Sequence, residues 1–130
     1  MNNHVSIWVG NFGSKEELMN YTNVEYTEDG DSISSVFEKD FNLDYYDRDL
    51  IEKKWISKST NSVKDLLDGF SYSDQFLEQF DTISYSAEFN TAILIYNLEY
   101  DAKKTKSKYN NSELKFIGVA QYTITFDDRW

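Results

Sequence analysis

The stretch Thr91-Ala92-Ile93-Leu94-Ile95-Tyr96 contains the densest apolar run of the chain and decides its fold. A short continuous apolar run of this kind predicts a buried, central strand. Upstream, residues 5–9 begin with alternation and end in three apolar residues, which predicts a second buried strand. Downstream, residues 114–126 alternate and predict the last strand. Its inward-facing set is either the even-numbered residues from Phe116 or the odd-numbered ones, so its register stays open.

Four short helices are expected between these strands, each behind a serine that can cap its N-terminus. The first two cover residues 15–21, after Ser14, and residues 35–41, after Ser32 or Ser34. The third follows Ser62 and ends at Gly69, and the fourth follows Ser73. Residues 51–56 alternate as well, and their lysines and glutamate predict an exposed or edge strand that is guarded by charge.

The predicted fold class is α+β: an antiparallel or mixed sheet with helices packed on one face, in the order β-α-α-β-α-α-β-β. The last two strands are joined by a loop too short for a helical crossover, so we expect them to form an antiparallel hairpin. A chain of 130 residues is long enough for one core without staples, and we expect a single domain over residues 1–130.

The composition excludes several classes of protein. Hydrophobic residues make up 40% of the chain and aromatic residues 17%, which excludes intrinsic disorder despite a net charge of -10. The absence of cysteine excludes thiolate zinc sites, disulfide frameworks and a cysteine nucleophile. Residues 1–10 lack the features of a signal peptide, and no apolar run approaches a membrane span, so we expect a cytoplasmic protein without a membrane partner. A pI near 4.4 opposes binding to nucleic acid.

Signals for catalysis are weak. His4 is the only histidine, and the chain contains neither a nucleophile elbow nor a phosphate-binding loop. The acidic turns do not follow the spacing of a calcium-binding EF-hand loop. We therefore expect no enzymatic activity, no cofactor and no metal. The alternatives left open are a small carboxylate-based hydrolase and a carbohydrate-binding module, because paired carboxylates are plentiful and three tryptophans are available for stacking.

Charge is distributed unevenly along the chain. Residues 25–49 contain nine acids and two bases, so most of the net negative charge falls in this stretch. Residues 101–115 show the opposite bias, with five lysines against two acids. Tyrosine is enriched at the energetic centres of interfaces, and carboxylates steer a basic partner during association. The pair Tyr45-Tyr46 beside acidic residues therefore suggests a protein-binding patch.

Several segments resemble the immunity protein 22 family. They are Val5-Ser6-Ile7-Trp8-Val9-Gly10-Asn11-Phe12, Tyr26-Thr27-Glu28-Asp29-Gly30-Asp31, Phe37-Glu38-Lys39-Asp40-Phe41, Tyr45-Tyr46-Asp47, Gly69-Phe70-Ser71-Tyr72, Tyr96-Asn97-Leu98-Glu99-Tyr100 and Phe116-Ile117-Gly118. The similarity keeps the order of the segments over nearly the whole chain. It implies a protein of bacterial polymorphic toxin systems that neutralises a cognate toxin, and it implies no catalytic residues. Ser34 stands where the family often has a proline.

The charge pattern and the resemblance lead to one hypothesis about the binding site. We expect the toxin to present a basic binding face, as a nuclease would, and the carboxylates of this chain to meet its lysines and arginines. The tyrosines would supply buried contact area. Self-association is compatible with this role and stays open. The expected toxin-binding residues are Glu28, Asp29, Asp31, Asp44, Tyr45, Tyr46, Asp47 and Asp49.

Overall fold

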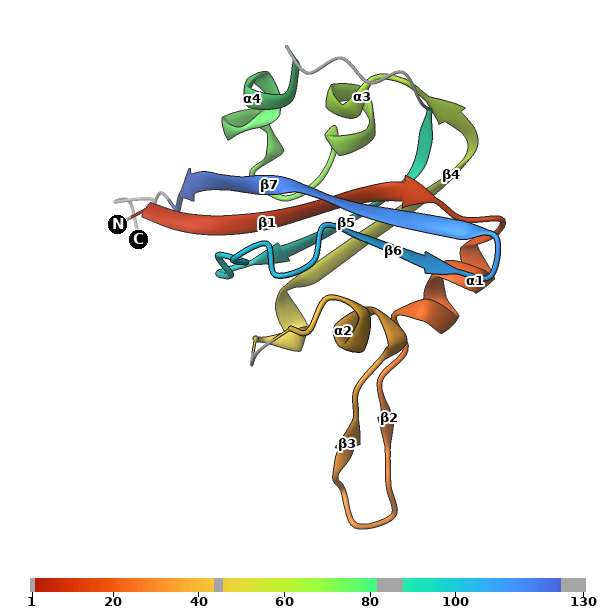
Figure 1. Ribbon diagram of the computed structural model, residues 1–130. Helices are drawn as coiled ribbons and strands as arrows, with labels where there is room; N and C mark the ends of the chain where they lie inside the picture. Colours follow the sequence, from red (N-terminus) through yellow and green to blue (C-terminus); the bar gives the residue numbers. More distant parts are fainter. Residues whose placement is uncertain (1, 44–45, 82–87, 125–130) are drawn as a thin grey trace.

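The computed structural model describes residues 2–43, 46–81 and 88–124. Its main feature is a five-stranded, fully antiparallel sheet with the strand order β4-β5-β1-β7-β6 (Figure 1). The strands are β1 (Asn2–Asn11), β4 (Ile51–Thr60), β5 (Phe89–Tyr96), β6 (Lys106–Tyr109) and β7 (Ser112–Thr123). A second, two-stranded sheet is formed by β2 (Glu25–Tyr26) and β3 (Ser32–Ile33).

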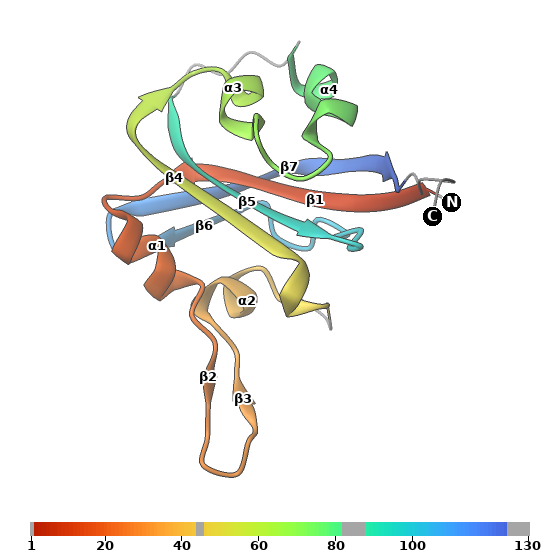
Figure 2. The same ribbon diagram turned by 180° about the vertical axis from the view of Figure 1, so that it is seen from behind.

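The helices lie on both faces of the large sheet, as Figures 1 and 2 show from opposite sides. They are α1 (Lys15–Tyr21) and α2 (Val36–Asp40) on one face and α3 (Val63–Leu67) and α4 (Leu77–Asp81) on the other, with 3-10 turns at η1 (Arg48–Leu50) and η2 (Ser73–Gln75). The α+β class is confirmed, but the expectation that all helices pack on one face is wrong.

The reason for two covered faces lies in the central strands. Ile7 and Trp8 point to opposite faces of β1, as Ile93 and Leu94 do on β5, and all four side chains have no exposed surface. A strand that is apolar on both sides must be covered on both sides to gain the free energy of burial. The sheet therefore separates two hydrophobic cores.

The two cores differ in the residues that fill them. The α3–α4 core joins Val5, Ile7 and Val9 to Leu66 and Phe80, among others. The α1–α2 core is centred on Trp8, whose indole lies between 5.1 and 5.8 Å from the ring centroids of its neighbours. These neighbours are Phe37, Phe41, Tyr100 and Phe116.

The predicted hairpin between the last two strands is wrong. β1 lies between β5 and β7 and pairs with both, so β5 and β7 are not neighbours. The hairpin partner of β7 is β6, which lies within the lysine-rich stretch of residues 101–115, where the sequence predicted a loop up to the last strand. β6 is an edge strand whose lysines at 106 and 108 are exposed. Lysine is a common residue on exposed sheet edges. Because lysines occupy two positions of this strand, its sequence lacks the apolar alternation that predicts a strand.

A β-bulge in β7 explains why neither inward-facing set predicted for this strand holds along its whole length. Ile7 pairs with Gly118 and Trp8 pairs with Phe116, which leaves Ile117 as the extra residue. Before the bulge Phe116 packs in the α1–α2 core, and after it Tyr122 packs in the α3–α4 core. Gly118 has φ +143, a backbone conformation that disfavours other residues.

The serine caps were predicted in part. Ser14 and Ser62 accept hydrogen bonds from the third residue of their helices, as expected. Helix α2 is capped by Ser35 rather than by Ser32 or Ser34, and Ser73 is not the cap of a fourth helix because it opens η2 instead.

Candidate functional site

The β2–β3 hairpin projects away from the body of the protein beyond α1 and α2 (Figures 1 and 2). Its turn is closed by backbone hydrogen bonds, from the Thr27 amide to the Asp31 carbonyl at 2.8 Å and from the Gly30 amide to the Thr27 carbonyl at 3.0 Å. Gly30 has φ +87, which suits glycine at this point of the turn. The carboxylates of Glu28 and Asp29 consequently lie exposed at the tip.

The predicted site residues fall into two groups. Three of them, Glu28, Asp29 and Asp31, lie in the exposed turn of the hairpin. Three others, Tyr46, Asp47 and Asp49, lie beside the base of the hairpin, where they share hollows with residues of β2 and β3. The structure thus brings both groups to one side of the molecule but places them at opposite ends of the hairpin. Asp44 and Tyr45 lie outside the described residues.

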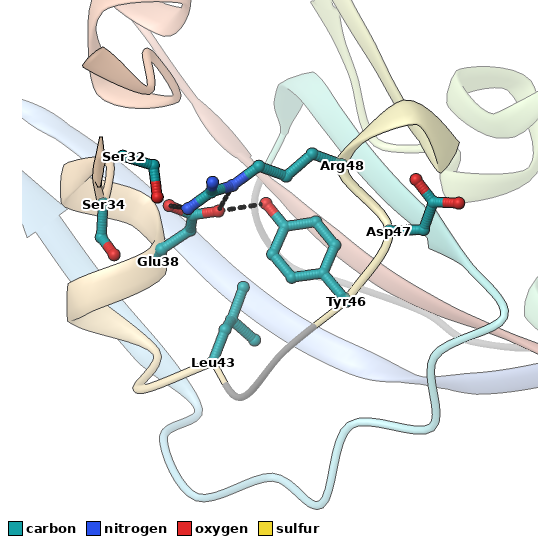
Figure 3. A pocket seen from close by; sticks show the side chains of 7 residues that line it. All are labelled: Ser32, Ser34, Glu38, Leu43, Tyr46, Asp47 and Arg48. Carbon is teal, nitrogen blue, oxygen red and sulfur yellow. Dashed lines mark hydrogen bonds and ion pairs between the residues drawn. The ribbon is translucent and has the colours of Figure 1, made fainter. Parts of the chain in front are cut away.

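A hollow of about 440 Å³ at the base of the hairpin is organised around the carboxylate of Glu38 (Figure 3). Arg48 approaches this carboxylate with two nitrogens, Nε at 2.8 Å from Oε2 and Nη2 at 3.1 Å from Oε1. The Tyr46 hydroxyl donates to Oε2 at 2.6 Å, and the Ser35 backbone amide donates to Oε1 at 2.9 Å. The other lining residues are Ser32, Ser34, Leu43 and Asp47.

These four contacts make Glu38 the connection between α2 and the segment that follows it. Ser35 and Glu38 form a capping box, because the Ser35 hydroxyl also accepts from the Glu38 amide at 3.1 Å. The same carboxylate holds Tyr46 and Arg48 against α2. Both residues lie in the segment between α2 and β4. Of the Glu38 side chain, 5% is exposed. The Glu38 contacts therefore fix the position of residues 46–48 relative to the hairpin.

The charge state of Glu38 follows from these contacts. Burial opposes ionisation, but the hydrogen bonds from Arg48, Tyr46 and Ser35, together with the positive charge of Arg48, outweigh it and lower the pKa of Glu38 below its ordinary value. Burial and the neighbouring Glu38 carboxylate raise the pKa of the Tyr46 hydroxyl, which stays protonated and able to donate. The ion pair is accordingly intact at neutral pH.

We expect the stability of the protein to fall more steeply with decreasing pH than that of a Glu38→Gln variant. The pKa of Glu38 is lower in the folded than in the unfolded chain, so its stabilisation is complete above the ordinary value of 4.5 and is lost as the pH falls through the folded-state pKa. Glutamine does not titrate, so this part of the slope disappears. Urea unfolding midpoints from about pH 7 to about pH 3 measure it.

The matched control for this titration is Glu78→Gln. Glu78 also pairs with a base, Lys64, at 2.9 Å, but 76% of its side chain is exposed. Exposed pairs contribute little to stability, so this variant should have nearly the same urea midpoint at pH 7 as the unaltered protein. Equal slopes with pH for the Glu38→Gln variant and the unaltered protein would contradict the assignment.

Several functional features of this region were missed from the sequence. Glu38 and Arg48 were counted only as charges, although the spacing Ser35-x-x-Glu38 is a recognisable capping box. Tyr26 and Ile33 were not among the expected site residues, yet these residues are 66% and 43% exposed. A large apolar side chain within an acidic, turn-rich segment is the sequence signal that would have indicated that these two residues are exposed.

Other features predicted from the sequence have structural roles. Trp8 is fully buried, as its apolar neighbours suggested, and the indole Nε1 of Trp55 donates to the Phe12 carbonyl at 2.8 Å. His4 lies 3.0 Å from the Glu99 carboxylate at the surface. Within the described ranges, no group of three histidine or carboxylate residues could hold a metal ion, and no helix is long and apolar enough to cross a membrane.

Comparison with known proteins gives one match. A family model described as Immunity protein 22 matches residues 5–123, a range that covers all the described helices and nearly all of the strand residues. No curated protein and no solved structure matches the chain significantly.

Proposed function

The chain belongs to the immunity protein 22 family, and we propose that it binds a cognate bacterial toxin in the cytoplasm and neutralises it through an acidic surface. The surface consists of the turn residues Glu28, Asp29 and Asp31 and the base residues Tyr46, Asp47 and Asp49, with Asp44 and Tyr45 as further candidates from the sequence. Family membership supports the immunity role, and the projecting acidic hairpin supports the surface.

The charge of the hairpin supports a basic partner. Residues 23–34 contain four acids and no base. At the base of the hairpin Arg48 is paired with Glu38, and the exposed carboxylates of Asp47 and Asp49 outnumber the one further base that lines these hollows, Lys53. Such a surface accelerates association with a positively charged protein and fixes its orientation.

A nuclease is the class of toxin that fits this surface best. Nuclease sites hold phosphates with lysine and arginine side chains, and carboxylates form charge-assisted hydrogen bonds with the same groups. An acidic hairpin can therefore occupy the place of a phosphate backbone. Binding is favoured over catalysis because Glu38, the buried carboxylate in the hollow at the base of the hairpin, is already engaged by Arg48, Tyr46 and Ser35.

We expect a fivefold charge-neutralised variant to bind the toxin more slowly and more weakly than the unaltered protein. The substitutions are Glu28→Gln, Asp29→Asn, Asp31→Asn, Asp47→Asn and Asp49→Asn. All five side chains are exposed, so the fold should persist, while the association rate should fall by about tenfold or more at low salt. Surface plasmon resonance with the toxin domain encoded next to this gene measures the rates.

The control for this experiment carries the same type of substitution elsewhere. Asp65 and Asp74 are exposed and belong to α3 and η2, which lie on the opposite face of the sheet from α1 and α2. A variant with Asp65→Asn and Asp74→Asn should bind like the unaltered protein. If the fivefold variant also does so at every salt concentration, the acidic surface is not the binding site.

A further inference from the structure

Exposed apolar side chains are concentrated on and around the β2–β3 hairpin. Six large hydrophobic side chains are exposed in the part of the chain that the structure describes, and four of them fall within residues 19–36. These four are Met19 in α1, Tyr26 in β2, Ile33 in β3 and Val36 in α2. A concentration of exposed apolar surface on one protruding element is typical of an interaction site.

The hairpin itself has little support from the rest of the protein. Every residue from 25 to 34 is exposed, and among the described strands β2 and β3 pair only with each other, through two residues each. A two-stranded hairpin on its own is at best marginally stable in water. Covering Tyr26 and Ile33 would add free energy of burial that the free protein lacks, so a bound partner would stabilise the hairpin.

The register of the hairpin places its two apolar residues on opposite faces. Tyr26 pairs with Ser32, and Glu25 pairs with Ile33. Neighbouring residues of a strand point to opposite sides of the ribbon, so Tyr26 projects from one face and Ile33 from the other. A flat partner surface could cover only one of them. Covering both requires two walls, one on each side of the ribbon.

The face with Tyr26 continues onto the body of the protein. Tyr26 shares a hollow of about 350 Å³ with Met19 of α1 and with Arg48 and Asp49 of η1. A partner wall that covers Tyr26 would therefore also reach Met19. The acidic turn lies at the far end of the ribbon, so its carboxylates would arrive at the bottom of any cleft that the ribbon enters.

We propose that the β2–β3 hairpin inserts into a cleft of the toxin that has apolar walls and a basic floor. Tyr26 and Ile33 contact the two walls, and the carboxylates of Glu28, Asp29 and Asp31 meet the floor. This inference rests on the proposed function and adds to it the shape and the chemistry of the partner's surface. A basic cleft is a substrate site in a nuclease, so the hairpin blocks the toxin by occupying that cleft.

Thiol labelling tests whether both faces of the hairpin are covered. The chain contains no cysteine, so a single introduced thiol is labelled specifically. Glu25→Cys reports on the face with Ile33, Ser32→Cys on the face with Tyr26, and Gln121→Cys, at an exposed position in β7, is the control. With a saturating amount of the adjacent-gene toxin domain, labelling by a maleimide should slow strongly at both hairpin positions and stay unchanged at Gln121. Slower labelling at only one of the two hairpin positions would contradict insertion of the hairpin into a cleft.

Alanine variants test the two anchors. Tyr26→Ala and Ile33→Ala should each raise the Kd for the toxin domain by about tenfold or more, as buried anchors do. Ile124→Ala is the matched control, because Ile124 is exposed to 38% and Ile33 to 43%. The thermal unfolding of all three variants should match that of the unaltered protein, since these side chains are exposed.

The outcomes separate this inference from the proposed function. If the unaltered protein binds the toxin domain and both hairpin variants bind equally well, the hairpin is not inserted, while the immunity role stands. If only one variant weakens binding, the partner surface is flat. If the unaltered protein fails to bind the toxin domain, the proposed function fails and the inserted hairpin fails with it.

Discussion

Replacing Glu38 with alanine is expected to lower the free energy of unfolding by about 2–3 kcal/mol, because it removes a buried carboxylate that accepts several hydrogen bonds. The carboxylate accepts two hydrogen bonds from Arg48, one from the Tyr46 hydroxyl and one from the Ser35 amide. All of these donors lose their acceptor in the variant, and Arg48, whose side chain is 34% exposed in the unaltered protein, loses its ion-pair partner. Urea unfolding followed by tryptophan fluorescence measures the loss.

The control for this substitution is a carboxylate in an exposed ion pair. Glu78 contacts Lys64 at 2.9 Å, and its side chain is 76% exposed. Exposed pairs contribute at most about 1 kcal/mol, so Glu78→Ala should cost little. If Glu38→Ala costs no more than Glu78→Ala, the Glu38 contacts do not hold residues 46–48 in place.

The second large effect is expected at Trp8. Trp8→Ala should cost about 3–5 kcal/mol, because it removes the largest side chain of the α1–α2 core and leaves a cavity between α2 and the sheet. Four aromatic rings would lose their common neighbour, and the relaxation of a close-packed core closes only part of such a cavity. The change is measured as a shift of the urea midpoint by circular dichroism.

A second variant keeps this prediction testable if Trp8→Ala does not fold. Trp8→Phe keeps an aromatic ring and removes the indole Nε1, which is buried and has no hydrogen-bond partner among the described residues. Relief of this unsatisfied donor offsets part of the lost packing, so the cost should be clearly smaller than for alanine. A cost for phenylalanine equal to or above that for alanine would contradict the central role of ring packing.

The central strands of the fold could be predicted because strands buried on both faces appear in the sequence as continuous apolar runs. The run Ala92-Ile93-Leu94-Ile95-Tyr96 and the triplet Ile7-Trp8-Val9 lie in β5 and β1, the two strands that are buried on both faces. Strands that are apolar on both sides also imply that both faces of the sheet are covered, but the helices were expected on one face only. Sheet order could not be predicted, since pairing between β1 and β7 joins residues more than 100 positions apart and no local pattern encodes it.

The site was predictable in its charge but not in its geometry. The acids of residues 25–49 are visible in the sequence, whereas the projection of the hairpin depends on how α1 and α2 pack against the sheet. Glu38 was missed as an organising residue because its partners Tyr46 and Arg48 lie eight and ten positions away, outside helical periodicity. Such a contact requires the chain to turn back on itself, and an irregular segment gives no periodic signal of that turn.

The central position of β1 has a consequence for synthesis on the ribosome. Within this domain β1 is translated before the other strands, yet Val5 pairs with Tyr96 and Ala120, which are translated near the end of the domain. Translation at roughly 5–20 residues per second leaves this apolar strand without its neighbours for several seconds. The large sheet can therefore close around β1 only in polypeptides that have been translated through β7.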